Sequence, residues 1–445
     1  MIQLKNIFLL VRSKINPDSV KELSWVFAGQ VINVALSFVI VKILSGMGPH
    51  DYGIYALVIT IAVFIGMSFY GPVAQGFIRF YYHYLEKSLS NIFTSLIYKI
   101  LIVSSLIFVF LSVLFFILTS FINLPEPSLF FLIAGIYIVL AKLTEFFNST
   151  LNLIRKRKEN SLLQGAEKAV IILFLFVLLH FKDLNLIYVF ISLSIVALIF
   201  SSIKFLVFQK FLPAESKKDS SFVKSSQAGM RAKLFLYISP FLIWGFSGWL
   251  QLNGEKWIIN GLLTTADVGI YAVMLALVNA LIIVPNNIIS DFASPIIFQQ
   301  YSDMSNKKNI DTGFHYIRLN MLIIFSLTLF STFITYFWGR EIIILISNKN
   351  YTPYWYLLPL LCFGTGMFLT GQAQTVLGMA LNLPKKYLLP KILIGLLSIV
   401  LNFVLIKFLG INGVAYTVLI IGIIYVIYIA LVNRKIKIIF SSSMN

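Results

Sequence analysis

Residues 51–57 read Asp-Tyr-Gly-Ile-Tyr-Ala-Leu, and residues 267–273 read Asp-Val-Gly-Ile-Tyr-Ala-Val. Five of the seven positions are identical, and the copies lie 216 residues apart (267 minus 51) in a chain of 445 residues. Each copy follows a short turn and begins a long apolar run. A repeat at this offset indicates duplicated structural units, so the sequence predicts two equivalent halves.

The composition indicates a membrane protein. Hydrophobic residues make up 59% of the chain, charged residues only 12%, and the mean hydropathy is +0.91, whereas soluble domains carry roughly 25% charged residues. Apolar runs of 18 or more residues are typical of transmembrane helices. The sequence therefore predicts an all-α, polytopic membrane protein with about twelve transmembrane helices, near residues 22–45, 52–78, 92–120, 127–152, 165–184, 186–208, 233–258, 268–298, 315–338, 353–381, 384–407 and 411–432.

Six predicted spans separate the two copies of the repeat. An even number gives both halves the same direction through the membrane, as in transporters built from parallel repeats. The predicted organisation is a cytoplasmic amphipathic N-terminal segment (1–21), an N-terminal six-helix half (22–208), a cytoplasmic basic linker (209–232), a C-terminal six-helix half (233–432) and a cytoplasmic tail (433–445).

The distribution of lysine and arginine predicts that both termini are cytoplasmic, because cytoplasmic loops carry the excess of basic residues. Most of the 35 basic residues fall on that side or its flanks, and Lys142 falls within a span. Six fall toward the outside: Lys42, Lys182, Lys256, Arg340, Lys349 and Lys407. Anionic lipid on the cytoplasmic side accounts for the net charge of +18, so no nucleic-acid partner is expected.

The only cysteine, Cys362, and four scattered histidines give neither a disulfide nor a metal-ligand spacing. No metal and no cofactor are expected. Gly71-Pro72, Pro240, Pro285, and Pro359 with Gly364 and Gly366 mark expected helix interruptions.

Several short motifs occur in one order along the chain: Gly46-Met47-Gly48-Pro49 before the first repeat copy, Gly76-Phe77-Ile78-Arg79-Phe80, Gly254-Glu255-Lys256-Trp257-Ile258, and Gly410-Ile411-Asn412-Gly413. In this order the chain resembles the Wzx-type polysaccharide flippases, the O-antigen and capsule repeat-unit exporters of the multidrug/oligosaccharidyl-lipid/polysaccharide exporter superfamily. The resemblance implies export of oligosaccharide linked to undecaprenyl diphosphate across the bacterial inner membrane. It implies contact with membrane lipid, proton or sodium coupling, and a polysaccharide polymerase and chain-length regulator as partners.

Charged residues within spans are costly and often functional. Lys142 and Glu145 are three residues apart and share a helix face, which Asn148 and Asn152 extend. We expect this face to line the substrate cavity. The alternative is a structural ion pair that fixes helix packing.

Two further cations are candidates for the substrate cavity. Arg79 ends the second span, where a guanidinium could grip a diphosphate, or could be a positive-inside anchor. Lys42 could meet the head group at the outer leaflet, or simply extend its ammonium to the interface.

Glu255, Lys256 and Asp291 are candidates for a gate or for ion coupling. The alternatives are an interfacial pair without a role for Glu255 and Lys256, and packing with Asn286 and Asn287 for Asp291.

Two rival functions differ in class. A cation-coupled multidrug exporter of the same superfamily would typically carry an acid in its first span, where this chain has Lys42 and no acid after Glu22. An integral-membrane polysaccharide-assembly enzyme would carry a large outer loop or an Asp-x-Asp motif, and the sequence has neither. No enzyme activity is therefore expected.

Overall fold

The computed structural model describes residues 17–122, 127–181, 184–212, 220–301, 307–381 and 383–442. Residues 1–16 of the predicted amphipathic segment, together with Lys182, Lys217 and Lys218, lie outside these ranges. The described residues form helices joined by short turns, with no strand among them.

Eleven helical segments of the described chain are long and apolar enough to cross a membrane. They are α2 (Pro17–Leu44), α3 (Pro49–Ile65) continuing through η2 (Gly66–Tyr70) into α4 (Gly71–Glu86), α5 (Ser90–Ser120), α6 (Ser128–Leu153), α7 (Arg157–His180), α8 (Leu186–Lys210), α9 (Ser220–Leu262), α10 (Thr265–Val278) continuing through η3 (Asn279–Ile283) into α11 (Val284–Gln300), α12 (Lys307–Ile346), α15 (Leu388–Leu409) and α16 (Asn412–Ser442).

One further helix, α13 (Leu357–Gln374), lies where the tenth span is expected and brings the number of described membrane helices to twelve. Its 18 residues include two glutamines, two threonines and three glycines, which lower its hydropathy. The prediction of about twelve membrane helices is confirmed. Four short elements complete the described chain: η1 (Ser45–Met47), η4 (Lys349–Tyr354), α14 (Val376–Ala380) and η5 (Pro384–Tyr387).

The chain forms two compact units. The first comprises Met1–Ile40 and Val58–Trp249, and the second comprises Val41–Leu57 and Leu250–Asn445. The boundaries fall inside α2, α3 and α9, so these three helices run from one unit into the other. The described part of the predicted linker from Ser220 onward is helical, because α9 begins there.

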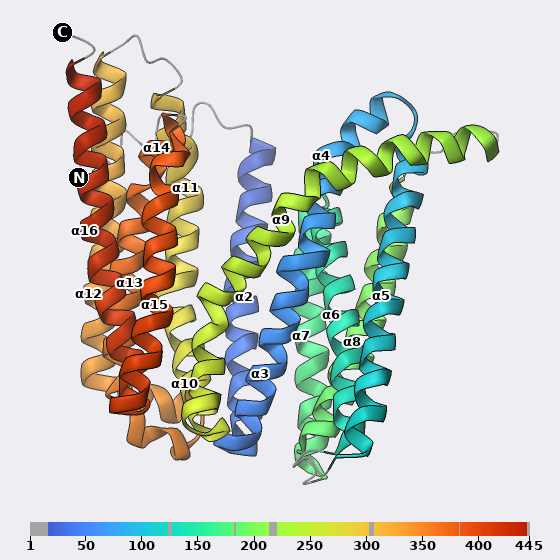
Figure 1. The fold of residues 1–445 in the computed structure, drawn as a ribbon, viewed down its shortest axis with the longest axis horizontal. Helices are drawn as coiled ribbons and strands as arrows, with labels where there is room; N and C mark the ends of the chain where they lie inside the picture. The colour runs from blue at the N-terminus through green and yellow to red at the C-terminus, as the bar shows by residue number, and fades with distance from the viewer. Residues whose placement is uncertain are drawn as a thin grey trace. The chain divides into compact units, whose positions relative to one another are not determined.

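Phe77 is the centre of the aromatic core of the first unit. It is 1% exposed, and its ring lies 5.7 Å from Phe93, 5.9 Å from Phe146 and 6.1 Å from Phe208. These rings come from α4, α5, α6 and α8, which Figure 1 shows gathered together. A large buried aromatic of this kind fixes how four helices pack.

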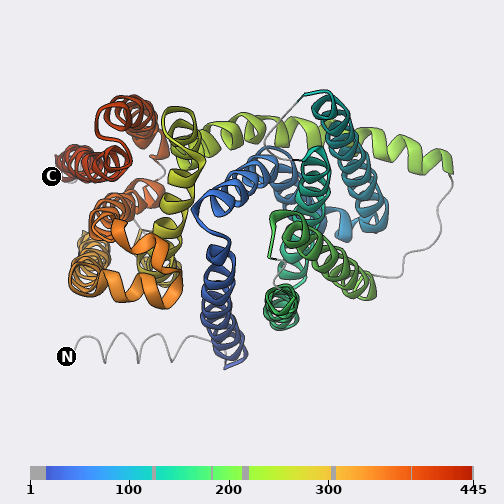
Figure 2. The same cartoon turned by 90° about the horizontal axis from the view of Figure 1, so that it is seen from below.

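Glycines bring the helices of the second unit close together. In this unit α13 packs against α12 and α16, and Figure 2 shows the helices end on. A Cβ on Gly364 would lie 2.7 Å from the backbone of Leu419, and one on Gly422 would lie 2.1 Å from the Gly364 oxygen. Small residues allow such close packing in membranes.

The interruption expected at Pro359, Gly364 and Gly366 is wrong. Residues 357–374 form one α-helix, in which Pro359 occupies the first turn, where its missing N–H does no harm. The second unit instead has a kink in α12 at Trp338, where φ is −119° and ψ is 17°.

The two copies of the sequence repeat begin α3 and α10, as predicted, and they pack against each other within the second unit. A Cβ on Gly53 would lie 1.9 Å from the Thr265 oxygen, and a Cβ on Gly269 would lie 1.9 Å from the Pro49 oxygen. Each glycine therefore faces the carbonyl four residues before the other glycine. This reciprocity is what a local two-fold relation between the repeats produces.

A π-helical turn interrupts the second helix of each half. The turns are η2 and η3, and a proline follows each one as the second residue of α4 or α11, namely Pro72 and Pro285. Proline cannot donate a backbone hydrogen bond and crowds the preceding turn, and π-bulges often mark functional sites. The interruptions predicted at Gly71-Pro72 and Pro285 are confirmed.

We expect Gly53→Ala and Gly269→Ala each to destabilise the protein by about 1–3 kcal/mol, because the added methyl group overpacks against a backbone oxygen. Thermal unfolding in detergent micelles measures the effect. Gly261→Ala in α9 is the matched control, since a Cβ there meets nothing within 4 Å. An unfolding temperature of Gly53→Ala or Gly269→Ala as high as that of the control would contradict the close crossing.

Candidate functional site

The predicted pair of Lys142 and Glu145 forms in α6 of the first unit. The Lys142 ammonium donates a hydrogen bond of 2.6 Å to Glu145 Oε1. The Lys142 side chain is 6% exposed, whereas that of Glu145 is 61% exposed. Lys142 lies about 2 Å along the helix axis from the middle of α6, so the pair is deep within the span.

The Lys142 side chain lies across Gly66, the first residue of the π-helical turn η2. A Cβ at Gly66 would approach Lys142 Cδ to 3.0 Å and its Nζ to 3.2 Å. The glycine therefore leaves the room that the lysine occupies. In this way the irregular turn and the buried cation belong to one site.

The exposure of Glu145 indicates which face of α6 borders water. An ionised side chain facing hydrocarbon near the middle of a span costs about 2.5–3.5 kcal/mol even on insertion scales. Because most of the Glu145 side chain is uncovered by protein, we expect this face of α6 to border water rather than lipid.

A polar stripe on α7 extends the site. Asn160, Gln164 and Lys168 are spaced four residues apart and share one helix face, and Glu167 lies beside that face. Asn160 is 2% exposed, and its side-chain amide donates to the backbone oxygen of Asn148 at 3.3 Å and to Asn152 Oδ1 at 2.9 Å. The α7 stripe therefore joins the α6 face that carries Lys142 and Glu145.

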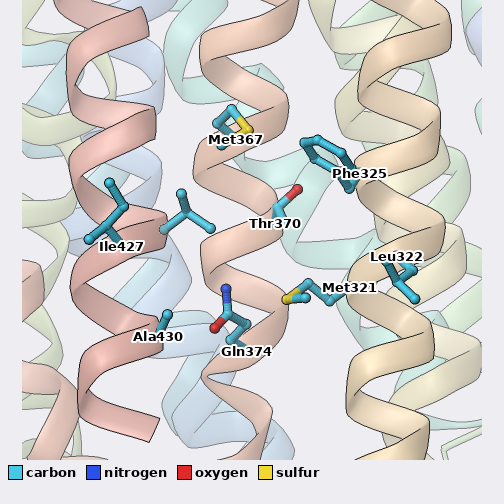
Figure 3. A pocket seen from close by; sticks show the side chains of 9 residues that line it. Met321, Leu322, Phe325, Met367, Thr370, Gln374, Ile427 and Ala430 are labelled. Carbon is cyan, nitrogen blue, oxygen red and sulfur yellow. The ribbon is translucent and has the colours of Figure 1, made fainter. Parts of the chain in front are cut away.

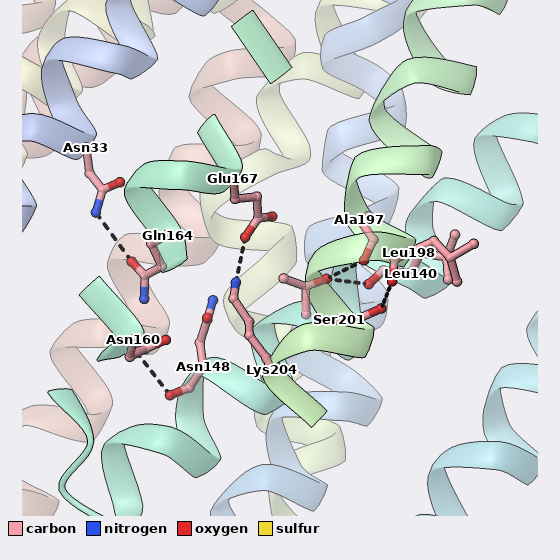
Figure 4. A network of polar contacts seen from close by, with 11 residues as sticks. Asn33, Leu140, Asn148, Asn160, Gln164, Glu167, Ala197, Leu198, Ser201 and Lys204 are labelled. Atoms are coloured by element: carbon pink, nitrogen blue, oxygen red, sulfur yellow. Dashed lines mark hydrogen bonds and ion pairs between the residues drawn. The ribbon is translucent and has the colours of Figure 1, made fainter. Parts of the chain in front are cut away.

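The stripe also contacts α2 at three successive positions along the two helices. A Cβ on Gly29 would lie 1.7 Å from Ser161 Oγ, and Asn33 Nδ2 donates to Gln164 Oε1 at 3.5 Å (Figure 4). The Lys168 ammonium donates to the backbone oxygen of Asn33 at 2.9 Å and to Ser37 Oγ at 2.7 Å. The regular spacing on both helices shows that α2 and α7 run alongside each other here.

The third element is an ion pair between α7 and α8. Lys204 has no exposed surface, and its ammonium donates to Glu167 Oε2 at 2.5 Å (Figure 4). A buried ammonium needs such a partner, because desolvation of an unpaired charge is costly. The polar groups on α2, α6, α7 and α8 thus form one connected cluster within the first unit.

Sequence reasoning missed the α7 stripe for an identifiable reason. The fifth span was expected to begin at 165, which placed Asn160 and Gln164 in a cytoplasmic connection, whereas α7 begins at Arg157. Lys204 was counted with the cytoplasmic flanks although it is fully buried. The spacing of Asn160, Gln164 and Lys168 at four residues was the available signal.

Arg79 and Lys42 lie elsewhere. Arg79 is exposed on α4 and makes no hydrogen bond or ion pair within the part of the chain that the structure describes. Lys42, also exposed, donates to the Ile344 oxygen near the C-terminus of α12. A lysine at a helix C-terminus satisfies a free carbonyl and stabilises the helix dipole, which favours a structural role for Lys42.

Glu255 and Lys256 do not pair with each other, because adjacent helix residues point in different directions. Glu255 Oε1 accepts from the Tyr271 hydroxyl at 3.4 Å, and Lys256 donates to Asn253 Oδ1 at 3.2 Å. The first of these contacts joins α9 to the second copy of the repeat in α10. Asp291 is exposed on α11.

An apolar cavity of about 430 Å³ lies in the second unit, between α12, α13 and α16 (Figure 3). Met321, Phe325, Met367 and Ile427 line it with five other residues, of which only Thr370 and Gln374 are polar. None of the charged candidates lines this cavity. A polar head group therefore has no partners there comparable to those in the first unit.

The structure is similar to those of known transporters. It matches the lipid II flippase MurJ in an inward closed conformation with a TM-score of 0.68 and 15% identity, over 93% of this chain and 87% of that chain. It matches a multidrug resistance MATE family transporter of the MOP superfamily in an inward-facing conformation with a TM-score of 0.64 and 12% identity, over 96% and 99%. For an outward-facing MATE structure the values are 0.56 and 13%, over 93% and 94%.

These TM-scores show a shared fold, that of a multi-pass membrane protein. The family model described as polysaccharide biosynthesis protein matches residues 19–301, well over half of the chain. The protein belongs to this polysaccharide biosynthesis family, and the resemblance found in its sequence is confirmed. No curated protein sequence matches the chain significantly.

We expect Glu167→Leu to destabilise the protein by about 3–5 kcal/mol, because it leaves the Lys204 ammonium buried without a partner. Adding Lys204→Met should recover most of this loss, since a well-packed apolar pair can replace a buried ion pair. Thermal unfolding of the single and double variants in detergent measures both effects.

The matched control for Glu167→Leu is Glu159→Leu, which removes the exposed partner of Lys156 on the same helix. An exposed pair contributes about 0–1 kcal/mol. Equal losses for Glu159→Leu and Glu167→Leu would contradict the buried ion pair.

Proposed function

We propose that this protein is a flippase that moves oligosaccharide linked to undecaprenyl diphosphate across the bacterial inner membrane, by alternating access between its two helical halves. The observation that carries the proposal is the buried Lys142 ammonium paired with the exposed Glu145 within the span formed by α6. Membership of the polysaccharide biosynthesis family supports a glycan as cargo.

The charges of the first unit suit an anionic head group. The connected cluster contains Lys142, Lys168 and Lys204 against Glu145 and Glu167, so cations are in excess. Ammonium groups in a site of low dielectric bind phosphate oxygens strongly. A carrier of cationic drugs would instead need an excess of carboxylates, which argues against the multidrug-exporter alternative.

The proposed path begins at Arg79. Its exposed guanidinium has no partner among the described residues, and a guanidinium can hold a phosphate through two parallel hydrogen bonds. The diphosphate then passes to Lys142, while Asn148 faces the attached sugar. The lipid tail stays in the bilayer throughout, so only the head group needs a hydrated route.

Release and coupling involve the remaining candidates. Glu255 and Lys256 act as a gate, Asp291 takes up a proton or sodium ion, and Lys42 lies near the exit. The termini are cytoplasmic, and the product is an O-antigen, capsule or lipopolysaccharide repeat unit. A polysaccharide polymerase and a chain-length regulator then act on it.

We expect deletion of the gene in the native host to abolish the surface polysaccharide and to leave the complete repeat unit on its carrier in the inner leaflet. Extraction of membrane lipids and an assay of surface polymer measure this. Complementation with Lys142→Ala or Arg79→Ala should restore little polymer, because each variant removes a phosphate-binding cation.

Arg318→Ala is the matched control for Arg79→Ala, since Arg318 is also an exposed arginine and lies on α12. It should restore the polymer fully. Normal polymer and no accumulated intermediate in the deletion strain would overturn the proposal and favour the drug exporter.

A further inference from the structure

The polar cluster of the first unit contains hydrogen-bonding groups that no residue satisfies. Within the described residues, the side-chain oxygens Asn33 Oδ1, Asn148 Oδ1 and Asn160 Oδ1 are buried and have no donor. Asn33 is 5% exposed and Asn160 2% exposed. Buried acceptors of this kind are rare in folded proteins and indicate a bound water or ligand.

The same cluster contains N–H groups that donate no hydrogen bond to the described residues. Lys168 has three N–H groups. The backbone oxygen of Asn33 and Ser37 Oγ accept hydrogen bonds from two of them. The Gln164 amide nitrogen donates to none of the residues that the structure describes. Gln164 and Lys168 are only half-buried, so a ligand can reach them.

Charge decides which ligand fits these groups. Three amide oxygens alone would suit a sodium ion, but Lys142, Lys168 and Lys204 lie in the cluster against the two carboxylates of Glu145 and Glu167. Their repulsion disfavours a further cation. A ligand that both donates and accepts hydrogen bonds and carries no positive charge satisfies every free group, and sugar hydroxyls have this property.

We infer that the face formed by Asn33, Asn148, Asn160, Gln164 and Lys168 is a saccharide-binding subsite that recognises the glycan of the lipid-linked cargo. The inference rests on the proposed function. The asparagine oxygens accept hydrogen bonds from sugar hydroxyls, while Gln164 and Lys168 donate to them. Asn148 lies six residues beyond Lys142 on α6, about 9 Å along the axis, so one ligand can place its phosphate at Lys142 and its sugar at this face.

Binding to the purified full-length protein in nanodiscs tests the inference. The probes are bare undecaprenyl diphosphate and the carrier-linked repeat unit extracted from the deletion strain. We expect wild type to bind the glycan-bearing carrier about tenfold more tightly, a difference of a few hydrogen bonds. Asn160→Ala and Gln164→Ala should reduce its affinity to that for the bare carrier, whereas Lys142→Ala should weaken both.

Asn402→Ala is the matched control, because Asn402 is 4% exposed and its Oδ1 is also without a partner, but it lies in α15 of the second unit. It should keep the tenfold preference. Gln164 is half-buried, so Gln164→Ala keeps the test valid if Asn160→Ala fails to fold.

The outcomes separate the two proposals. Equal binding of both probes by wild type, or a preference that survives in Gln164→Ala and Asn160→Ala, would overturn the saccharide subsite and leave the flippase proposal intact. Stabilisation of wild type by sodium chloride over choline chloride, lost in Asn160→Ala, would identify a cation site instead. Failure of wild type to bind either probe would overturn both proposals.

Discussion

The hydrocarbon of the bilayer imposes the constraint on which this structure depends. Without water, every backbone group must be satisfied inside its own segment, which restricts the spans to helices. Hydroxyl side chains obey the same rule: Thr328 and Thr335 each donate to the carbonyl four residues earlier. Charged groups must find a partner or face water, and Lys204 pairs with Glu167 as Lys142 pairs with Glu145.

Close approach of backbones is the second principle of the fold. In membranes the hydrophobic effect does not drive helices together, so packing through small residues matters more. Gly53 and Gly269 allow the two repeat copies to cross, and Gly364 and Gly422 bring α13 and α16 together. At both positions only glycine fits opposite a carbonyl oxygen at this distance.

The two halves keep equivalent helices but differ in chemistry. The first unit places lysines, glutamates and amides on facing sides of α2, α6, α7 and α8. The second unit has an apolar cavity at α12, α13 and α16, with Thr370 and Gln374 as its polar lining.

The sequence by itself determined the membrane class, the span count, the repeat that begins α3 and α10 and the Lys142–Glu145 pair, because apolar length, repetition and spacing along one helix are local properties. Tertiary structure alone decided that Lys42 caps α12, that Glu255 and Lys256 find separate partners, and that α7 faces α2. These contacts depend on which helices are neighbours and how each is rotated about its axis. In an almost uniformly apolar chain, hydropathy does not specify that rotation, and packing does.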